Sequence, residues 1–94
     1  MEPRALHATT KFEREVELAK KRGKDLEKLK EIIDLLLARK VLPRSLRDHL
    51  LKGEWKGYRD LHIEPDWLLI YKADPDNIWL TRTGTHSDIF GKKQ

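Results

Sequence analysis

The spacing of apolar residues changes once along the chain, from a helical period in the first forty residues to strand-like alternation later. Residues 26–37 place Leu or Ile at every third or fourth position, which predicts an amphipathic helix with one stripe for burial. Residues 58–63 alternate instead, with Leu61 and Ile63 on the apolar face. The polar face of this segment consists of Tyr58, Asp60 and His62. A chain of 94 residues has room for one core, so helices and strands must share it.

Two helices are predicted in the first half of the chain. The first covers residues 11–22, because Thr10 and Glu13 have the spacing of a capping box and Gly23 suits the position after the last turn. Asp25 can cap the second helix. Helices joined by a short glycine-containing loop form an antiparallel hairpin, which needs a partner for its apolar face.

Three strands are predicted in the second half, at residues 58–63, 67–72 and 78–83, with proline-containing turns between them. A weaker strand is predicted at residues 6–10. Successive strands with short turns form an antiparallel meander on which the helical hairpin can pack. We therefore expect one two-layer α+β domain over residues 1–94, with an N-terminal strand and a helical hairpin packed on a small antiparallel sheet.

Composition excludes several classes of protein. The chain has no cysteine, so no disulfide framework or thiolate metal site can stabilise it, and a reducing environment is favoured. The longest apolar run is residues 67–71, far below the roughly 20 residues that cross a bilayer. The first residues also lack the apolar segment of a signal peptide. We therefore expect a cytoplasmic protein without membrane contact.

Basic charge is concentrated in one stretch. Residues 39–60 contain seven Lys or Arg and three Asp or Glu, an excess that equals the net charge of +4 for the whole chain. Such a segment is typical of a surface that faces a polyanion, although a solvated loop with scattered bases explains it equally well. Its candidate contacts to phosphate are Lys52, Lys56 and Arg59.

Three of the four histidines, His49, His62 and His86, lie in the half of the chain that the predicted helices do not occupy, with Asp66 and Arg82 near them in the sequence. Cleavage of RNA by its own 2′-hydroxyl requires a base, an acid and a cation that stabilises the charged phosphorane. Histidine can serve as base or acid near neutral pH. Such a set could therefore form a ribonuclease site that needs no metal or other cofactor, in which Arg82 holds the phosphate and Asp66 orients an imidazole. Ordinary surface or half-buried histidines explain the same pattern equally well.

The other candidate residues each allow two interpretations. Trp67 and Phe90 could stack an unpaired base, but large aromatic residues in small domains more often belong to the core. A metal site built on His62 and Asp66 is disfavoured, because the four-residue spacing spans a turn with proline rather than a helix. His7 is predicted to be structural.

Two long motifs lie in the second half of the chain: HLLKGEWKGYRDLHIEPDWLLIY at residues 49–71 and RTGTHSDIF at residues 82–90. Both resemble the YafQ-type toxins of the RelE superfamily, and the resemblance extends over nearly the whole chain. Such toxins are mRNA interferases of bacterial type II toxin–antitoxin systems. The resemblance implies a RelE-like fold and a ribosome-dependent endoribonuclease that cuts mRNA in the ribosomal A site without a metal, and so inhibits translation.

The resemblance also implies roles for individual residues. Those that it places in acid–base chemistry are His49, His62, Asp66 and His86. It implies that Arg82 contacts the phosphate and that Trp67 and Phe90 support the substrate. We expect His49 or His86 to be the base, with His62 and Arg82 engaging the phosphate and the leaving group.

The implied partners are a cognate RelB/DinJ-like antitoxin, the ribosome and mRNA. Operator DNA would be contacted only through the toxin–antitoxin complex, and the toxin alone would be a monomer. The alternative function is a non-catalytic RNA- or DNA-binding module that acts as the partner in a toxin–antitoxin repressor. A third interpretation is an inactivated toxin that only sequesters antitoxin.

Overall fold

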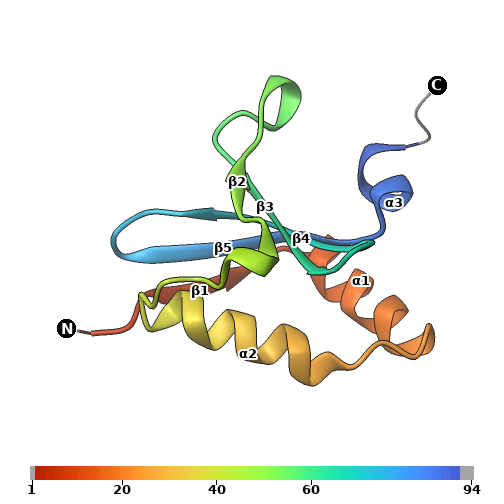
Figure 1. Cartoon of the computed structure of the whole chain (residues 1–94), viewed down its shortest axis with the longest axis horizontal. Coiled ribbons are helices and arrows are strands. Elements are labelled where there is room, and N and C mark those ends of the chain that lie inside the picture. The colour runs from red at the N-terminus through yellow and green to blue at the C-terminus, as the bar shows by residue number, and fades with distance from the viewer. Residues whose placement is uncertain (1, 92–94) are drawn as a thin grey trace.

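The computed structural model describes residues 2–91 and places a helical layer against a five-stranded sheet (Figure 1). In chain order the elements are β1 (Ala5–Ala8), α1 (Thr10–Lys21), α2 (Leu26–Leu37), β2 (His49–Leu50), β3 (Arg59–Glu64), β4 (Trp67–Ala73), β5 (Asn77–Gly84) and α3 (His86–Phe90). Short 3-10 turns at Arg44–Leu46 and Gly53–Trp55 flank β2. Among the described residues, no helix is both long and apolar enough to span a membrane.

The two predicted helices are confirmed, with one change at the first cap. Thr9, rather than Thr10, caps α1, because the Thr9 hydroxyl accepts a hydrogen bond of 2.9 Å from the backbone N–H of Phe12. Gly23 follows α1 with a φ of 83°, a left-handed conformation that glycine adopts without strain. Asp25 caps α2 as predicted.

The sheet has the strand order β1-β5-β4-β3-β2. The meander of β3, β4 and β5 is antiparallel, as predicted from the short turns. β1 runs parallel to β5, however, so the sheet is mixed rather than antiparallel throughout. Parallel pairing is possible here because both long helices lie between the two strands in the chain. The predicted two-layer α+β fold with an N-terminal strand is confirmed.

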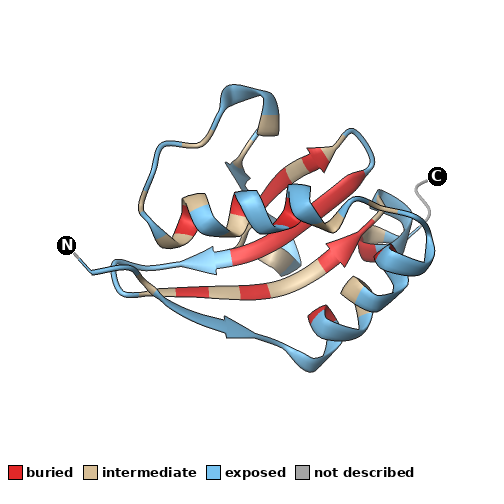
Figure 2. Ribbon diagram, turned by 90° about the horizontal axis from the view of Figure 1, so that it is seen from below, coloured by how far each residue is buried: buried red, intermediate tan, exposed pale blue. Residues whose placement is uncertain are grey.

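The two faces of the sheet differ in how they are covered (Figure 2). α1 and α2 cover one face, and the main core there includes Leu29 and Ile32 of α2 and Leu61 and Leu69 of the sheet. The opposite face carries a smaller cluster of Leu68, Ile70 and Ile89, the last from α3. Because α3 has only five residues, much of this second face is left for polar and aromatic side chains.

Candidate active site

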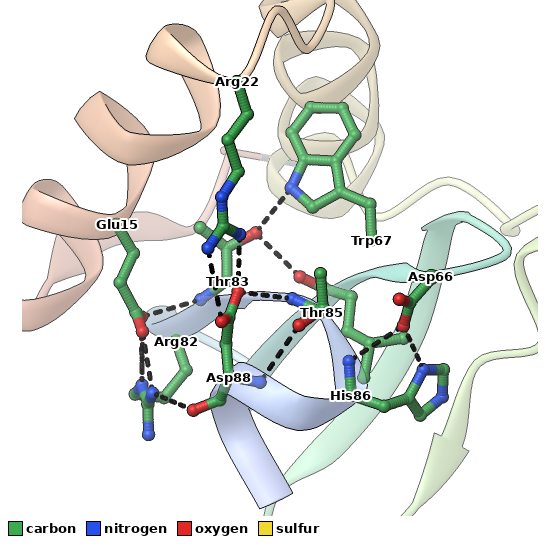
Figure 3. Close-up of polar contacts among 10 residues, drawn as sticks. Glu15, Arg22, Asp66, Trp67, Arg82, Thr83, Thr85, His86 and Asp88 are labelled. Atoms are coloured by element: carbon green, nitrogen blue, oxygen red, sulfur yellow. Dashed lines mark hydrogen bonds and ion pairs between the residues drawn. The ribbon is translucent and has the colours of Figure 1, made fainter. Parts of the chain in front are cut away.

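His86 and Asp66 form the best-defined pair of the site (Figure 3). Asp66, in the turn between β3 and β4, accepts two hydrogen bonds through Oδ1, from the His86 backbone N–H at 2.9 Å and from His86 Nδ1 at 2.6 Å. A carboxylate only accepts, so Nδ1 carries the proton and Nε2 is left for a substrate. These hydrogen bonds, the backbone one first, lower the pKa of Asp66.

A capping box fixes the helix that carries His86. The Thr85 hydroxyl accepts from the backbone of Asp88 at 3.0 Å, and the Asp88 carboxylate accepts from the backbone of Thr85 at 2.9 Å. Arg22, just after α1, donates to the same carboxylate at 2.6 Å. The hydrogen bond from Arg22 is the main cause that lowers the pKa of Asp88 to about 2. Gly84 permits this approach, since a Cβ there would lie 2.9 Å from the Asp88 side chain.

His62 faces His86 across the site. The two ring centroids are 5.5 Å apart, and the rings are inclined by 55°. His62 is directed to the second face of the sheet, because it pairs with Leu68 across β3 and β4. A cavity of about 440 Å³ adjoins His62 and is also lined by Ser45 and Arg47. The site therefore has two neighbouring imidazoles and an open space with a basic side chain beside one of them.

His49 approaches the site from the neighbouring strand β2. Its Nδ1 donates to the carbonyl of Arg47 at 2.7 Å, which leaves Nε2 directed toward Asp60, 4.0 Å from Oδ2. That separation is a charge contact rather than a hydrogen bond. Within residues 2–91, no group of three or more His, Cys, Asp or Glu side chains is arranged to hold a metal ion.

Asp60 is a site residue that the sequence analysis did not select. It is only 4% exposed, and its Oδ1 has no hydrogen-bond partner among the described residues. Burial raises the pKa of Asp60, and the nearby His49, His62 and His86 oppose this effect. Its position two residues before His62, on the same polar face of the predicted strand, was the available signal. A buried carboxylate thus lies among the three histidines.

Most of the Arg82 guanidinium is occupied by partners within the protein. Its Nε and Nη2 donate to the Glu15 carboxylate at 2.7–3.0 Å, and Nη2 also donates to the Asp88 carbonyl at 3.1 Å. Figure 3 shows this cluster on the α1 side of α3, with His86 on the other side. Arg82 thus connects α1, β5 and α3. Only Nη1 lacks a hydrogen bond to a described residue and could meet a phosphate.

Trp67 is a core residue. This corrects the prediction that it supports the substrate by stacking on a base. It is 1% exposed, so neither face of the indole is open for a base. Its Nε1 donates to the Thr83 hydroxyl at 3.0 Å, and that hydroxyl donates to the Leu68 carbonyl at 2.7 Å. Trp67 therefore joins β4 to β5 directly beside Asp66.

The remaining predicted substrate contacts do not gather in one place. Phe90 is half-buried on α3, one helical turn from His86. Lys52 and Lys56 are exposed on the long connection between β2 and β3, which extends from the sheet (Figure 1). Arg59 is corrected as a site residue, because it pairs with Tyr71 on the helix-covered face and donates to Asp48 at 3.0–3.1 Å.

The chain is similar to toxins of known structure over nearly its full length. A family model described as "Bacterial toxin of type II toxin-antitoxin system, YafQ" matches residues 4–91. The mRNA interferase toxin YafQ of Escherichia coli strain K12 is 46% identical over 89 residues, which are 94% of this chain and 97% of that protein.

Solved structures agree with the sequence comparison. The crystal structure of YafQ from E. coli strain BL21(DE3) has a TM-score of 0.90 at 45% identity, covering 94% of this chain and 99% of that chain. YafQ in the crystal structure of the E. coli DinJ-YafQ complex has a TM-score of 0.88 at 46% identity, with the same coverage. The chain described here therefore belongs to the YafQ family of bacterial toxins from type II toxin–antitoxin systems.

Proposed function

We propose that this protein is an endoribonuclease toxin that cleaves mRNA in the ribosomal A site through attack by the RNA's own 2′-hydroxyl. The observation that carries the proposal is the His86–Asp66 hydrogen bond of 2.6 Å, with the His62 ring centroid 5.5 Å from that of His86. Two adjacent imidazoles can supply the acid and the base that this reaction needs. The relative named mRNA interferase toxin YafQ supports mRNA as the substrate.

The proposed reaction divides two proton transfers among the histidines. A base removes the 2′-hydroxyl proton, the 2′-oxygen attacks phosphorus, and an acid protonates the departing 5′-oxygen. His49 and His86 each have Nδ1 held by an acceptor, so either can offer Nε2 as the base. His62 would then protonate the leaving group. The products are a 2′,3′-cyclic phosphate and a 5′-hydroxyl.

Charge at the phosphorane is balanced by cations around the imidazoles. Arg47 lines the cavity beside His62 and is the nearest candidate on that side. Arg82 would contribute through Nη1 while Glu15 holds the rest of its guanidinium. Asp60 would position His49 and balance its charge. The imidazoles supply both acid and base, so the proposed chemistry requires no metal.

The proposal includes the partners that the family implies. A crystal structure of the related YafQ contains DinJ, so we propose a DinJ-like antitoxin as the partner that neutralises this toxin. The ribosome and mRNA are the proposed targets, and operator DNA would be bound only by the toxin–antitoxin complex. We propose that the free toxin is monomeric and acts in the cytoplasm, where ribosomes translate. Lys52 and Lys56 would contact RNA phosphates.

Mapping mRNA ends on translating ribosomes tests the proposed function. The purified protein should cut within the A-site codon, and His86→Ala should lower the cleavage rate by at least about 100-fold. Ser87→Ala is the matched control, because Ser87 is exposed on the same helical turn, and it should cleave like the unsubstituted protein.

Growth after expression without antitoxin separates catalysis from binding. An unchanged cleavage rate with His86→Ala would overturn the catalytic assignment. If the unsubstituted protein cuts no RNA and His86→Ala still arrests growth, the non-catalytic binding module is correct instead.

A further inference from the structure

A row of rings and one lysine crosses the open face of the sheet. His7 of β1 stacks on Trp79 of β5 with ring centroids 5.3 Å apart and an interplanar angle of 18°. Lys72 of β4 places Nζ 5.9 Å from the Trp79 centroid and 5.8 Å from that of Tyr58, just before β3. We call these four residues, His7, Trp79, Lys72 and Tyr58, the aromatic stripe.

The aromatic stripe shares its face of the sheet with the histidines of the site. Trp79 is paired with His7 on one side and with Lys72 on the other. Lys72 follows Leu68 by four residues, and Leu68 is paired with His62. Residues separated by four on a strand point to the same face and lie about 14 Å apart along it. One RNA strand can therefore reach from His62 in the candidate active site to the aromatic stripe.

Further rings connect the stripe to the helix that carries His86. Tyr58 contacts Trp55 edge to face, with centroids 5.5 Å apart. Trp55 in turn contacts Phe90 at 6.3 Å, and Phe90 lies one turn after His86 on α3. Aromatic side chains thus continue from the open edge of the sheet to the candidate active site.

The outermost ring of the stripe is held in place before any ligand arrives. His7 donates through Nε2 to the Asn77 side-chain oxygen at 2.8 Å, since an amide oxygen can only accept. The Asn77 amide nitrogen donates to Asp74 at 3.2 Å, which fixes the orientation of Asn77. His7 and Lys72 are exposed and Trp79 is half-buried. An ordered ring loses little conformational freedom when a ligand stacks on it.

On the basis of the proposed function, we propose that the aromatic stripe binds single-stranded RNA next to the cleavage site. Bases would stack on His7 and Trp79, and Lys72 would contact a phosphate. Exposed rings combined with a cation are typical of platforms that bind single-stranded nucleic acid without strict sequence preference.

A protein partner fits this surface less well than RNA. Among the described residues, the exposed large aliphatic side chains are Leu6, Leu18, Val41 and Leu50. None of them belongs to the stripe, and Leu6 pairs with the buried Ile78 on the helix-covered face. The stripe thus lacks the large contiguous patch of exposed aliphatic side chains that marks many protein interaction sites.

Binding of uncleavable RNA of two lengths tests the proposal. The probes are fluorescent 2′-O-methyl oligonucleotides, a trimer that covers only the cleavage site and an octamer that also reaches the stripe, at low ionic strength. Trp79→Ala should weaken octamer binding by about 5-fold to 100-fold and leave trimer binding unchanged. Trp79→Phe keeps a ring and should restore most of the octamer affinity.

The salt dependence of octamer binding tests the lysine. Lys72→Gln should reduce the slope of log affinity against log salt by about 0.7. Lys30→Gln is the matched control, because Lys30 is an exposed lysine on α2, on the other side of the sheet, and it should leave the slope unchanged.

Each remaining outcome overturns the stripe in a different way. Equal affinities of Trp79→Ala and the unsubstituted protein for the octamer would remove the stripe from RNA binding. Equal losses for trimer and octamer would mean that Trp79 only stabilises the fold, and a loss of antitoxin binding alone would identify a protein interface. If the unsubstituted protein cleaves mRNA on ribosomes while any of these results holds, only the stripe fails. If it neither binds nor cleaves RNA, the proposed function fails with it.

Discussion

Replacing Asp60 with asparagine should stabilise the fold and weaken catalysis at the same time. The Asp60 side chain is 6% exposed and has one oxygen without a hydrogen-bond partner among the described residues. A buried charge without hydrogen bonds destabilises the fold, and asparagine removes the charge while it keeps the shape. A recovery of about 1 kcal/mol should raise the Tm at pH 7 by about 4–8 °C for a domain of this size.

The pH dependence of this gain separates charge from shape. Burial raises the pKa of Asp60 above the unfolded value of about 4, so the ionised group destabilises the folded protein at neutral pH. This cost decreases as the pH falls through the folded pKa and is absent below the unfolded one. The Tm difference between Asp60→Asn and the unsubstituted protein should therefore shrink between pH 7 and about pH 4. Thermal unfolding followed by circular dichroism measures it.

A matched control and an activity measurement complete the test. Asp34→Asn removes a carboxylate that is 60% exposed on α2 and should change stability by less than about 0.5 kcal/mol. Cleavage by Asp60→Asn should fall by about 10-fold to 100-fold, because His49 loses the charge 4.0 Å from its Nε2. A variant that is less stable at pH 7, or equally stabilised at every pH, would refute the buried-charge argument. Unchanged cleavage would remove Asp60 from the site.

Three further substitutions test how the site is supported. Asp88→Asn should cost about 1 kcal/mol by weakening the α3 cap. Because the pKa of Asp88 is lowered to about 2, this contribution is complete above about pH 4 and is lost as the pH falls through about 2. The free energy of unfolding, measured with urea, should therefore decrease less on acidification for the variant than for the unsubstituted protein. Glu15→Gln should cost about 3 kcal/mol in urea unfolding, because Arg82, 14% exposed, loses its counter-ion; a cost below about 0.5 kcal/mol would contradict this. Trp67→Phe loses the hydrogen bond to Thr83, so its free energy of unfolding should fall by about 1 kcal/mol while its cleavage rate stays unchanged. A lower cleavage rate at unchanged stability would instead show that Trp67 contacts the substrate.

The long elements of the fold could be predicted because each has a clear period and recognisable ends. α2 has exactly the bounds of its apolar repeat, 26–37, and β4 and β5 extend one or two residues beyond the predicted strands. α3 and β2 could not be predicted, since five and two residues are too few to show a period. The parallel pairing of β1 depends on contacts with β5, about seventy positions away in the chain, and no local pattern encodes it.

The sequence selected most of the candidate residues that the structure brings together, but not their hydrogen-bond partners. The sequence places Asp66 and His86 near motif ends, and the structure joins them by hydrogen bonds. The engagement of Arg82 with Glu15 spans 67 positions, so the sequence could not show that most of this guanidinium is occupied. The burial of Trp67 and Asp60 likewise depends on how the strands pack, which a single strand pattern leaves open.

The chemical nature of the RNA ends tests the central claim most directly. Attack by the 2′-hydroxyl must leave a 2′,3′-cyclic phosphate on the upstream fragment and a 5′-hydroxyl on the downstream one. Mass spectrometry of fragments from ribosomes translating a defined mRNA should find these ends, and a 2′-deoxy sugar at the cleaved position should abolish the cut. Fragments with a 3′-hydroxyl and a 5′-phosphate, or undiminished cleavage at the 2′-deoxy position, would contradict histidine-assisted attack by the 2′-hydroxyl.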